Sequence, residues 1–209
     1  MSDELVFYTH PMSRGRIVRW MLEEVGRPYR AELLEYGTTM KDPAYLAVNP
    51  MGKVPALRHG DTVITETAAI CAYLADAFPD AGLAPPPGDR RRGPYYRWLF
   101  FGAGPVEATV VNKALGVEMP DGSTGMAGCG VLAGVVDALE RAVSASPYVA
   151  GESFTAADVY VGSLLGWGLQ FHAVDPRPAF TSYWERISTR PAAIRAREID
   201  DALMAARPA

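Results

Sequence analysis

Hydrophobic positions near the start of the chain change from the spacing of a strand to the spacing of a helix. Leu5 to Tyr8 is an apolar run that ends at a Thr-His-Pro turn, which is typical of a buried strand. Apolar residues then recur every three or four positions from Ile17 to Val25, with charged residues between them. Gly26 followed by Pro28 is a helix stop signal. The pattern predicts a strand followed by an amphipathic helix.

Three further strands and two helices are predicted up to about residue 80. Tyr29 to Leu34 is a candidate strand, and a looser helical stretch surrounds residues 42–48. Apolar runs at residues 55–58 and 62–64 flank a His-Gly-Asp turn and predict a hairpin. A helix from Glu66 to Phe78 follows. This order of elements is similar to that of a thioredoxin-like domain.

A run of prolines, Ala84-Pro85-Pro86-Pro87-Gly88, divides the chain. Consecutive prolines favour a stiff extended conformation, so we expect a semi-rigid spacer here. Beyond it the strand alternation stops and the pattern is helical throughout. The predicted helices cover residues 90–115, with a kink at Pro105, and residues 126–143, 155–171, 181–188 and 191–206.

These patterns predict an α/β thioredoxin-like N-terminal domain plus an all-α C-terminal domain. We place the first domain at residues 1–81, the proline-rich linker at 82–88 and the helical domain at 89–209. One helix start is well specified, because Thr155 and Asp158 can form a capping box. Phe154 and Val159 stand where a hydrophobic staple needs them, so this segment is expected to serve folding.

Composition and charge exclude several classes of partner. Hydrophobic residues make up 49% of the 209 residues and charged residues 21%, which is ordinary for a globular protein. The net charge of −4 argues against a nucleic-acid partner, and no apolar run is long enough for a transmembrane helix. The two cysteines, Cys71 and Cys129, indicate neither a disulfide framework nor a metal site. We expect a cytoplasmic protein that does not enter a membrane.

Two neighbouring segments carry the strongest functional signal. Asn49 to Leu57 reads NPMGKVPAL, and Thr65 to Ile70 reads TETAAI. Together they resemble the glutathione-binding half of the glutathione S-transferase family, of the bacterial cytosolic type. The resemblance extends over essentially the whole chain and includes the Thr155 cap and the residues Thr189 to Ala192 before the last helix.

The resemblance implies five glutathione-binding residues. The Val54–Pro55 bond would be cis and would turn the backbone N–H and C=O of Val54 toward the cysteinyl backbone of glutathione. Thr67 would hold the γ-glutamyl carboxylate at a helix N-terminus, Glu66 the γ-glutamyl ammonium, and Lys53 the glycine carboxylate. Each position also has a plainer interpretation: an edge-strand proline, a helix cap with an acid in its first turn, and a solvated lysine.

Ser13 is the candidate catalytic residue. A free thiol with a pKa of about 8.5 is only a few per cent thiolate at pH 7, and lowering that value by about two units requires roughly 2.7 kcal/mol. One hydrogen bond to the thiolate and the field of a helix start can supply this. Ser13 is also a good N-cap. Tyr8 is the rival, since other classes of the family use a tyrosine near the end of the first strand, although a core role is the alternative. His10 could approach the sulfur, but a loop histidine beside a proline is more often a hydrogen-bonded turn residue.

The resemblance further implies that the helical half selects a small hydrophobic electrophile, with Tyr96, Phe100 and Trp167 as candidate pocket residues. It implies a homodimer, a role in detoxification and no cofactor or metal, with glutathione as cosubstrate. Neither cysteine stands at the first helix start, which disfavours cysteine-based thiol chemistry. Two alternatives stay open: a glutathione-binding scaffold without turnover, and a glutathione-dependent peroxidase, isomerase or dehalogenase.

Overall fold

The computed structural model describes residues 3–117, 120 and 125–207. Its contacts divide the chain into two compact units. The first unit consists of residues 1–81 and 189–209, and the second of residues 82–188. Each unit has its own buried core, and the two are described in turn.

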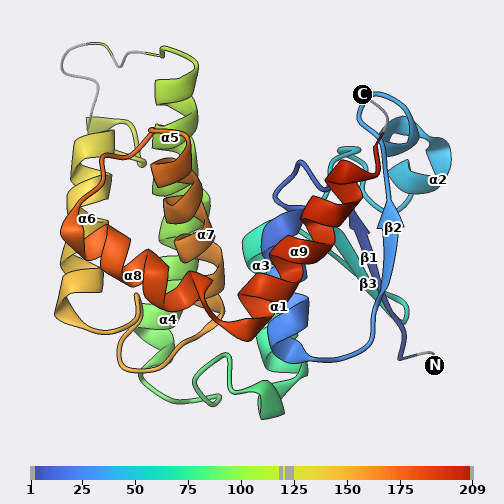
Figure 1. Ribbon diagram of the computed structural model, residues 1–209, viewed down its shortest axis with the longest axis horizontal. Helices are drawn as coiled ribbons and strands as arrows, with labels where there is room; N and C mark the ends of the chain where they lie inside the picture. Colours follow the sequence, from blue (N-terminus) through green and yellow to red (C-terminus); the bar gives the residue numbers. More distant parts are fainter. Residues whose placement is uncertain (1–2, 118–119, 121–124, 208–209) are drawn as a thin grey trace. The chain divides into compact units, whose positions relative to one another are not determined.

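The first unit is built on a four-stranded mixed sheet with the order β2-β1-β3-β4 (Figure 1). β1 (Leu5–Thr9) pairs in parallel with β2 (Arg30–Leu33) and antiparallel with β3 (Ala56–His59). β3 forms a hairpin with β4 (Thr62–Thr65). The central strand β1 is almost completely buried, as its apolar sequence predicts. The sheet confirms the expected thioredoxin-like domain.

Helices cover both faces of this sheet. On the face of Phe7, the Arg19 guanidinium of α1 lies 5.3 Å from the ring centre, and α1 also packs against α3. On the face of Tyr8, Met40 and Tyr45 form a small buried cluster with Ala56. The elements on the Phe7 face are α1 (Gly15–Val25) and α3 (Thr67–Ala77). Those on the Tyr8 face are η1 (Thr39–Lys41) and α2 (Pro43–Leu46). A short helix, η2 (Pro79–Ala81), follows α3.

The last helix, α9 (Pro191–Ala205), belongs to the first unit, whereas the sequence pattern places it in the helical domain. α9 packs along α1 (Figure 1). Arg19 of α1 forms a 2.8 Å ion pair with Asp200 of α9, and both side chains are almost completely buried. A buried charge needs a partner, so this pair ties α9 to α1. The apolar pattern of α9 predicts a helix but does not identify the surface against which it packs.

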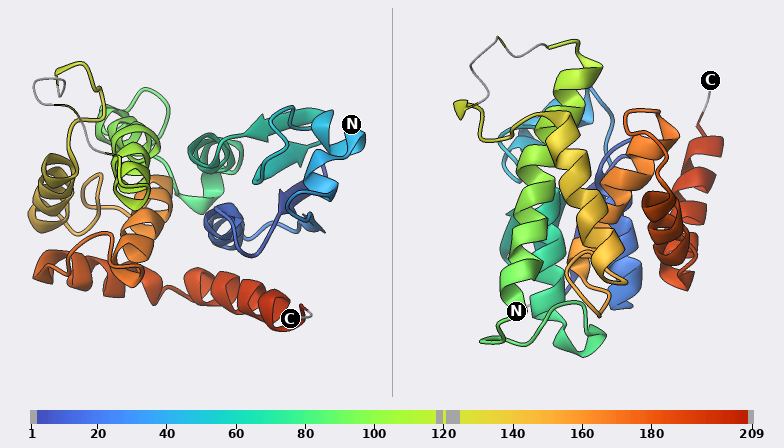
Figure 2. Two further views of the ribbon diagram at one scale, coloured as in Figure 1. Left: turned by 90° about the horizontal axis from the view of Figure 1, so that it is seen from above. Right: turned by 90° about the vertical axis from the view of Figure 1, so that its left-hand side faces the viewer.

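In the described residues of the second unit, the elements longer than a single bridge are helices, as predicted (Figures 1 and 2). Pro105 lies in a π-helical segment rather than at a simple kink, and the Thr109 hydroxyl donates to the Pro105 carbonyl at 2.7 Å. The helical elements are α4 (Arg92–Phe101), η3 (Gly102–Val106), α5 (Glu107–Ala114), α6 (Leu132–Ala145), α7 (Ala156–Gln170) and α8 (Pro178–Ser188).

α7 is the central helix of the second unit. It is buried on nearly all sides and packs against α4 and α8. The close approach to α8 requires glycine, since a Cβ on Gly162 would lie 2.2 Å from the Ile187 side chain. The predicted capping box is present at its start: the Asp158 carboxylate accepts the Thr155 N–H at 2.9 Å, and the Thr155 hydroxyl oxygen accepts a backbone N–H.

The helix predicted over residues 126–143 begins later than expected, at Leu132. Gly130 has a φ of 66°, and Val131 is extended. A left-handed residue cannot continue a helix, so the apolar residues before Gly130 lie outside α6. No helix in the described part of the chain is both long and apolar enough to cross a membrane.

Candidate functional site

Strand register brings the predicted site segments to one edge of the sheet. Tyr8 pairs with Ala56, and Ala56 pairs with Thr65. The three residues therefore lie side by side across two strand spacings, about 10 Å. The segments that continue from this row are the His10–Ser13 loop after β1, Val54–Pro55 before β3 and Glu66–Thr67 after β4. Residues far apart in the sequence thus meet at one end of the sheet.

The turn before β3 is held by side chains that donate to its carbonyls. The Val54–Pro55 bond is cis, as predicted. The Lys53 carbonyl accepts hydrogen bonds from the Tyr45 hydroxyl at 2.6 Å and from the Asn49 amide at 2.7 Å. Burial raises the pKa of Tyr45 to about 12, so its hydroxyl keeps the proton that it donates. The backbone at Lys53 is fixed by these bonds, while the Lys53 side chain is exposed.

Lys41 also stabilises the turn before β3. Its ammonium donates to the Met51 carbonyl at 3.1 Å and to the Gly52 carbonyl at 3.0 Å. Gly52 has a φ of 57°, and a Cβ there would lie 2.6 Å from the Met40 carbonyl oxygen. Sequence reasoning identified the turn but missed Lys41 and Tyr45. Their donors act across eight or more positions, and no local spacing marks such pairs.

Glu66 and Thr67 stand at the start of α3, with Glu66 in a strained conformation. Glu66 has a φ of 68° and a ψ of 119°, which a residue with a Cβ rarely adopts. Its side chain is exposed and makes no capping hydrogen bond. The interpretation of Glu66 as a plain helix cap is therefore disfavoured. Thr67 is buried and is the first residue of the helix, where backbone N–H groups lack partners within the helix.

Ser13 lies just before the first turn of α1 and is half-buried. Its hydroxyl donates to the His10 carbonyl at 2.6 Å and accepts the Gly15 N–H at 2.9 Å. A hydroxyl has one proton, so donation to a thiolate requires rotation away from His10. Arg14 is the residue that immediately precedes the helix, and its side chain makes no capping hydrogen bond. The bond from the Gly15 N–H to the Ser13 hydroxyl is of the kind that a capping serine accepts, so the plainer interpretation of Ser13 as a helix cap is supported.

Tyr8 occupies the other face of the sheet from α1. Its ring centre lies 5.5 Å from that of Tyr45, and it packs against the cluster of Met40, Tyr45 and Ala56. The packing of Tyr8 against this cluster fits its core interpretation, and Ser13 is the hydroxyl at the start of α1.

The candidate electrophile residues lie in the second unit. Tyr96 and Phe100 are one turn apart on α4, and their exposed fractions are 37% and 73%. The Arg92 guanidinium stacks over the Tyr96 ring at 5.6 Å and donates to its hydroxyl. Trp167 is half-buried on α7, the helix that packs against α4. Phe100 is the most exposed of the three and is the side chain most available to an apolar ligand.

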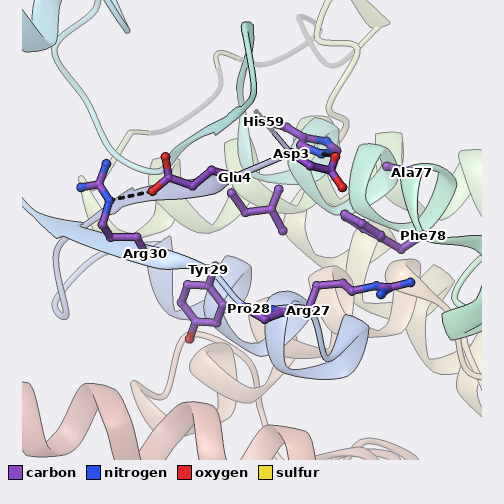
Figure 3. A pocket seen from close by; sticks show the side chains of 10 residues that line it. Asp3, Glu4, Arg27, Pro28, Tyr29, Arg30, His59, Ala77 and Phe78 are labelled. Atoms are coloured by element: carbon purple, nitrogen blue, oxygen red, sulfur yellow. Dashed lines mark hydrogen bonds and ion pairs between the residues drawn. The ribbon is translucent and has the colours of Figure 1, made fainter. Parts of the chain in front are cut away.

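A pocket of about 660 Å³ lies at the opposite end of the sheet, where β1 begins (Figure 3). The Arg27 guanidinium lies 5.7 Å from the centre of the Phe78 ring, and the His59 ring stacks on Phe78 with 5.6 Å between ring centres. Glu4 and Arg30, which also line the pocket, form a 3.0 Å ion pair. None of the predicted site residues lines this pocket.

In the described residues, no group of three His, Cys, Asp or Glu side chains could hold a metal ion.

Comparison with known proteins identifies the family. Residues 12–77 match the family model of the glutathione S-transferase N-terminal domain, and residues 130–191 match that of the C-terminal domain. Glutathione S-transferase 3 of Zea mays is 29% identical over 201 residues and 90% of each chain. The glutathione S-transferase GstA of an Escherichia coli strain is 30% identical over 166 residues and 77% of each chain.

Solved structures give the same result. A glutathione transferase from Methylococcus capsulatus is 31% identical, with a TM-score of 0.79 over 95% of this chain and 99% of that one. A sphingomonad glutathione S-transferase complexed with glutathione is 28% identical, with a TM-score of 0.77 over 94% of this chain and 98% of that one. The chain belongs to the glutathione S-transferase family. It is a transferase of that family by sequence and by fold.

Proposed function

We propose that this protein conjugates the thiol of reduced glutathione to a small hydrophobic electrophile. The strand register carries the proposal, because it aligns Tyr8, Ala56 and Thr65 across about 10 Å, and the Ser13 loop, Val54–Pro55 and Glu66–Thr67 continue from these three residues. A tripeptide has a similar span, about 3.4 Å for each residue. One tripeptide therefore spans the row from which all three segments continue.

The proposed binding roles follow from the groups that each segment presents. The N-terminus of α3 offers backbone N–H groups and the Thr67 hydroxyl to the γ-glutamyl carboxylate. The exposed Glu66 carboxylate faces the γ-glutamyl ammonium, and its strained backbone supports a binding role, since strained residues concentrate at functional sites. Val54 and Pro55 serve the cysteinyl backbone, and Lys53 serves the glycine carboxylate.

The proposed chemistry is thiolate activation followed by substitution. Bound glutathione releases its thiol proton to solvent, the Ser13 hydroxyl donates to the resulting thiolate, and the sulfur attacks the electrophile as its leaving group departs. Tyr96, Phe100 and Trp167 are the proposed contacts of the electrophile. We further propose a cytoplasmic homodimer with a role in detoxification.

A second candidate function is a glutathione-binding protein without turnover. One observation favours it: the single proton of the Ser13 hydroxyl is already donated to the His10 carbonyl at 2.6 Å. Two measurements on the same sample separate the candidates. Titration calorimetry with reduced glutathione tests binding, and steady-state conjugation with a generic aryl halide tests turnover. Binding with turnover supports the transferase, binding alone supports the second candidate, and the absence of binding contradicts both.

A further inference from the structure

The His10–Ser13 loop is held by side chains that donate to three of its carbonyls. The His10 carbonyl accepts the Ser13 hydroxyl, and the Pro11 carbonyl accepts Nε of Arg16 at 2.7 Å. The Met12 carbonyl accepts the Tyr36 hydroxyl at 3.1 Å. A loop with three successive carbonyls bonded has few alternative conformations, so the direction of the Ser13 hydroxyl depends on the residues that hold this loop.

His10 is almost completely buried, with an exposed fraction of 2%. Its Nδ1 accepts the Met12 N–H at 3.1 Å, so the neutral ring carries its proton on Nε2. The ring packs against Tyr36 with 4.6 Å between ring centres. The imidazole is thus bonded to the backbone at Met12 and packed against Tyr36, whose hydroxyl donates to the Met12 carbonyl.

The charged groups that face His10 come from two other segments. Nε2 lies 3.5 Å from Oε2 of Glu35, in the segment after β2. Glu35 is in turn paired with Arg207, beyond the end of α9, at 2.5 Å. Burial and the Arg207 charge lower the pKa of His10, while Glu35 opposes this shift. The neutral ring is therefore the form that the surroundings favour.

We propose that His10 is a positioning residue for Ser13, an inference that rests on the proposed function. The neutral imidazole accepts the Met12 N–H, fixes the His10–Ser13 loop and so keeps the Ser13 hydroxyl within reach of a thiolate. A ring that cannot accept this hydrogen bond releases the Met12 peptide, and the loop then no longer holds the Ser13 oxygen in place before α1. His10 acts through the backbone and does not touch the sulfur.

The test uses two variants of His10, of which only one keeps a hydrogen-bond acceptor for the Met12 N–H. In His10→Asn the amide oxygen stands close to the place of Nδ1 and can still accept the Met12 N–H. In His10→Leu a side chain of similar size has no acceptor. Ser13→Ala, the double variant His10→Leu/Ser13→Ala and the wild-type protein complete the set. For each full-length protein we would measure glutathione affinity by calorimetry, the apparent pKa of the bound thiol from thiolate absorbance, and hydrogen exchange at the Met12 and Gly15 amides.

We expect His10→Leu to raise the thiol pKa in the same direction as Ser13→Ala, to add nothing in the Ser13→Ala background and to accelerate exchange at Met12. His10→Asn should stay near the wild type in all three measurements. An unshifted thiol pKa in a folded His10→Leu protein, beside a shifted one in Ser13→Ala, would overturn the inference and leave the proposed function intact. A wild-type protein that does not bind glutathione, or a Ser13→Ala protein with an unshifted pKa, would instead contradict the proposed roles and this inference together.

Discussion

At the scale of single residues, the Ser13 hydroxyl decides how much the proposed site can lower the thiol pKa. We expect Ser13→Ala to raise the apparent pKa of bound glutathione by about one unit, which corresponds to roughly 1.4 kcal/mol of lost thiolate stabilisation. Glutathione affinity should change little, because the proposed role of Ser13 involves the sulfur and not the peptide groups. Thiolate absorbance against pH measures the shift.

Two variants control this prediction. Ser182→Ala removes an exposed hydroxyl of α8 and should leave the titration unchanged. Tyr8→Phe tests the rival, which packs on the other face of the sheet. A titration that moves in Tyr8→Phe and not in Ser13→Ala would assign the activation to the tyrosine.

Glu66 and Thr67 determine the affinity for glutathione in the proposed site. We expect Glu66→Ala and Thr67→Ala each to weaken binding by about 1.5–3 kcal/mol, the range for a lost hydrogen bond to a charged group. The fold should survive, because the Glu66 side chain makes no capping bond. Calorimetry provides the measurement, with the exposed Thr62→Ala at the far end of β4 as the control. Unchanged glutathione affinity in both variants would show that the side chains at the start of α3 do not bind glutathione.

The burial of His10 predicts that the free energy of unfolding depends on pH. Its pKa in the folded protein is below the ordinary 6.5, so the unfolded chain binds the proton more readily. The stability that depends on the neutral ring is present above pH 6.5 and is lost as the pH falls below it. We expect the free energy of unfolding of the wild type relative to His10→Asn, which does not titrate, to fall between about pH 8 and pH 5. A constant difference would show that protonation of His10 has no effect on folding.

At the scale of single elements, the start of α7 depends on one buried carboxylate. Asp158 accepts the Val149 N–H at 2.7 Å, the Thr155 N–H at 2.9 Å and the Tyr183 hydroxyl at 2.9 Å. Asp158→Ala leaves three buried donors without this acceptor, at about 1–3 kcal/mol for each. We therefore expect a loss of at least about 3 kcal/mol in the free energy of unfolding, measured by urea denaturation.

The matched control for Asp158 is Asp137→Ala in α6. Asp137 is paired with Arg177 at 2.8 Å, but its side chain is 51% exposed. Exposed ion pairs contribute about 1 kcal/mol or less. Equal losses in the two variants would contradict the role assigned to the buried cap.

At the scale of the whole molecule, we expect a homodimer in which α3 and the long helical segment 90–115 contribute the contacts. In that segment Val111 is 40% exposed and Leu115 is 72% exposed. Exposed apolar surface favours association. Light scattering at micromolar concentration should give about twice the 22.6 kDa of one chain. The mass of a single chain, unchanged on concentration, would rule the dimer out.

The sequence by itself determined what depends on near neighbours. The apolar spacing from Ile17 to Val25 predicted α1, and Thr155 with Asp158 predicted the start of α7, because each involves residues only a few positions apart. The segment from Asn49 to Leu57 predicted the turn, and its resemblance to the family implied the cis Val54–Pro55 bond. The resemblance to the family and the thioredoxin-like succession of strands and helices along the chain depend on local segments in the same way.

The tertiary structure alone decided what depends on distant partners. The Arg19–Asp200 pair joins positions 181 residues apart and places α9 with the first unit. Strand pairing, which no local pattern specifies, aligns Tyr8, Ala56 and Thr65 and so brings the candidate site together. The contacts of His10 with Glu35, and of Glu35 with Arg207, arise in the same way. A periodic pattern shows that a face must be buried, but only the folded chain determines which surface covers it.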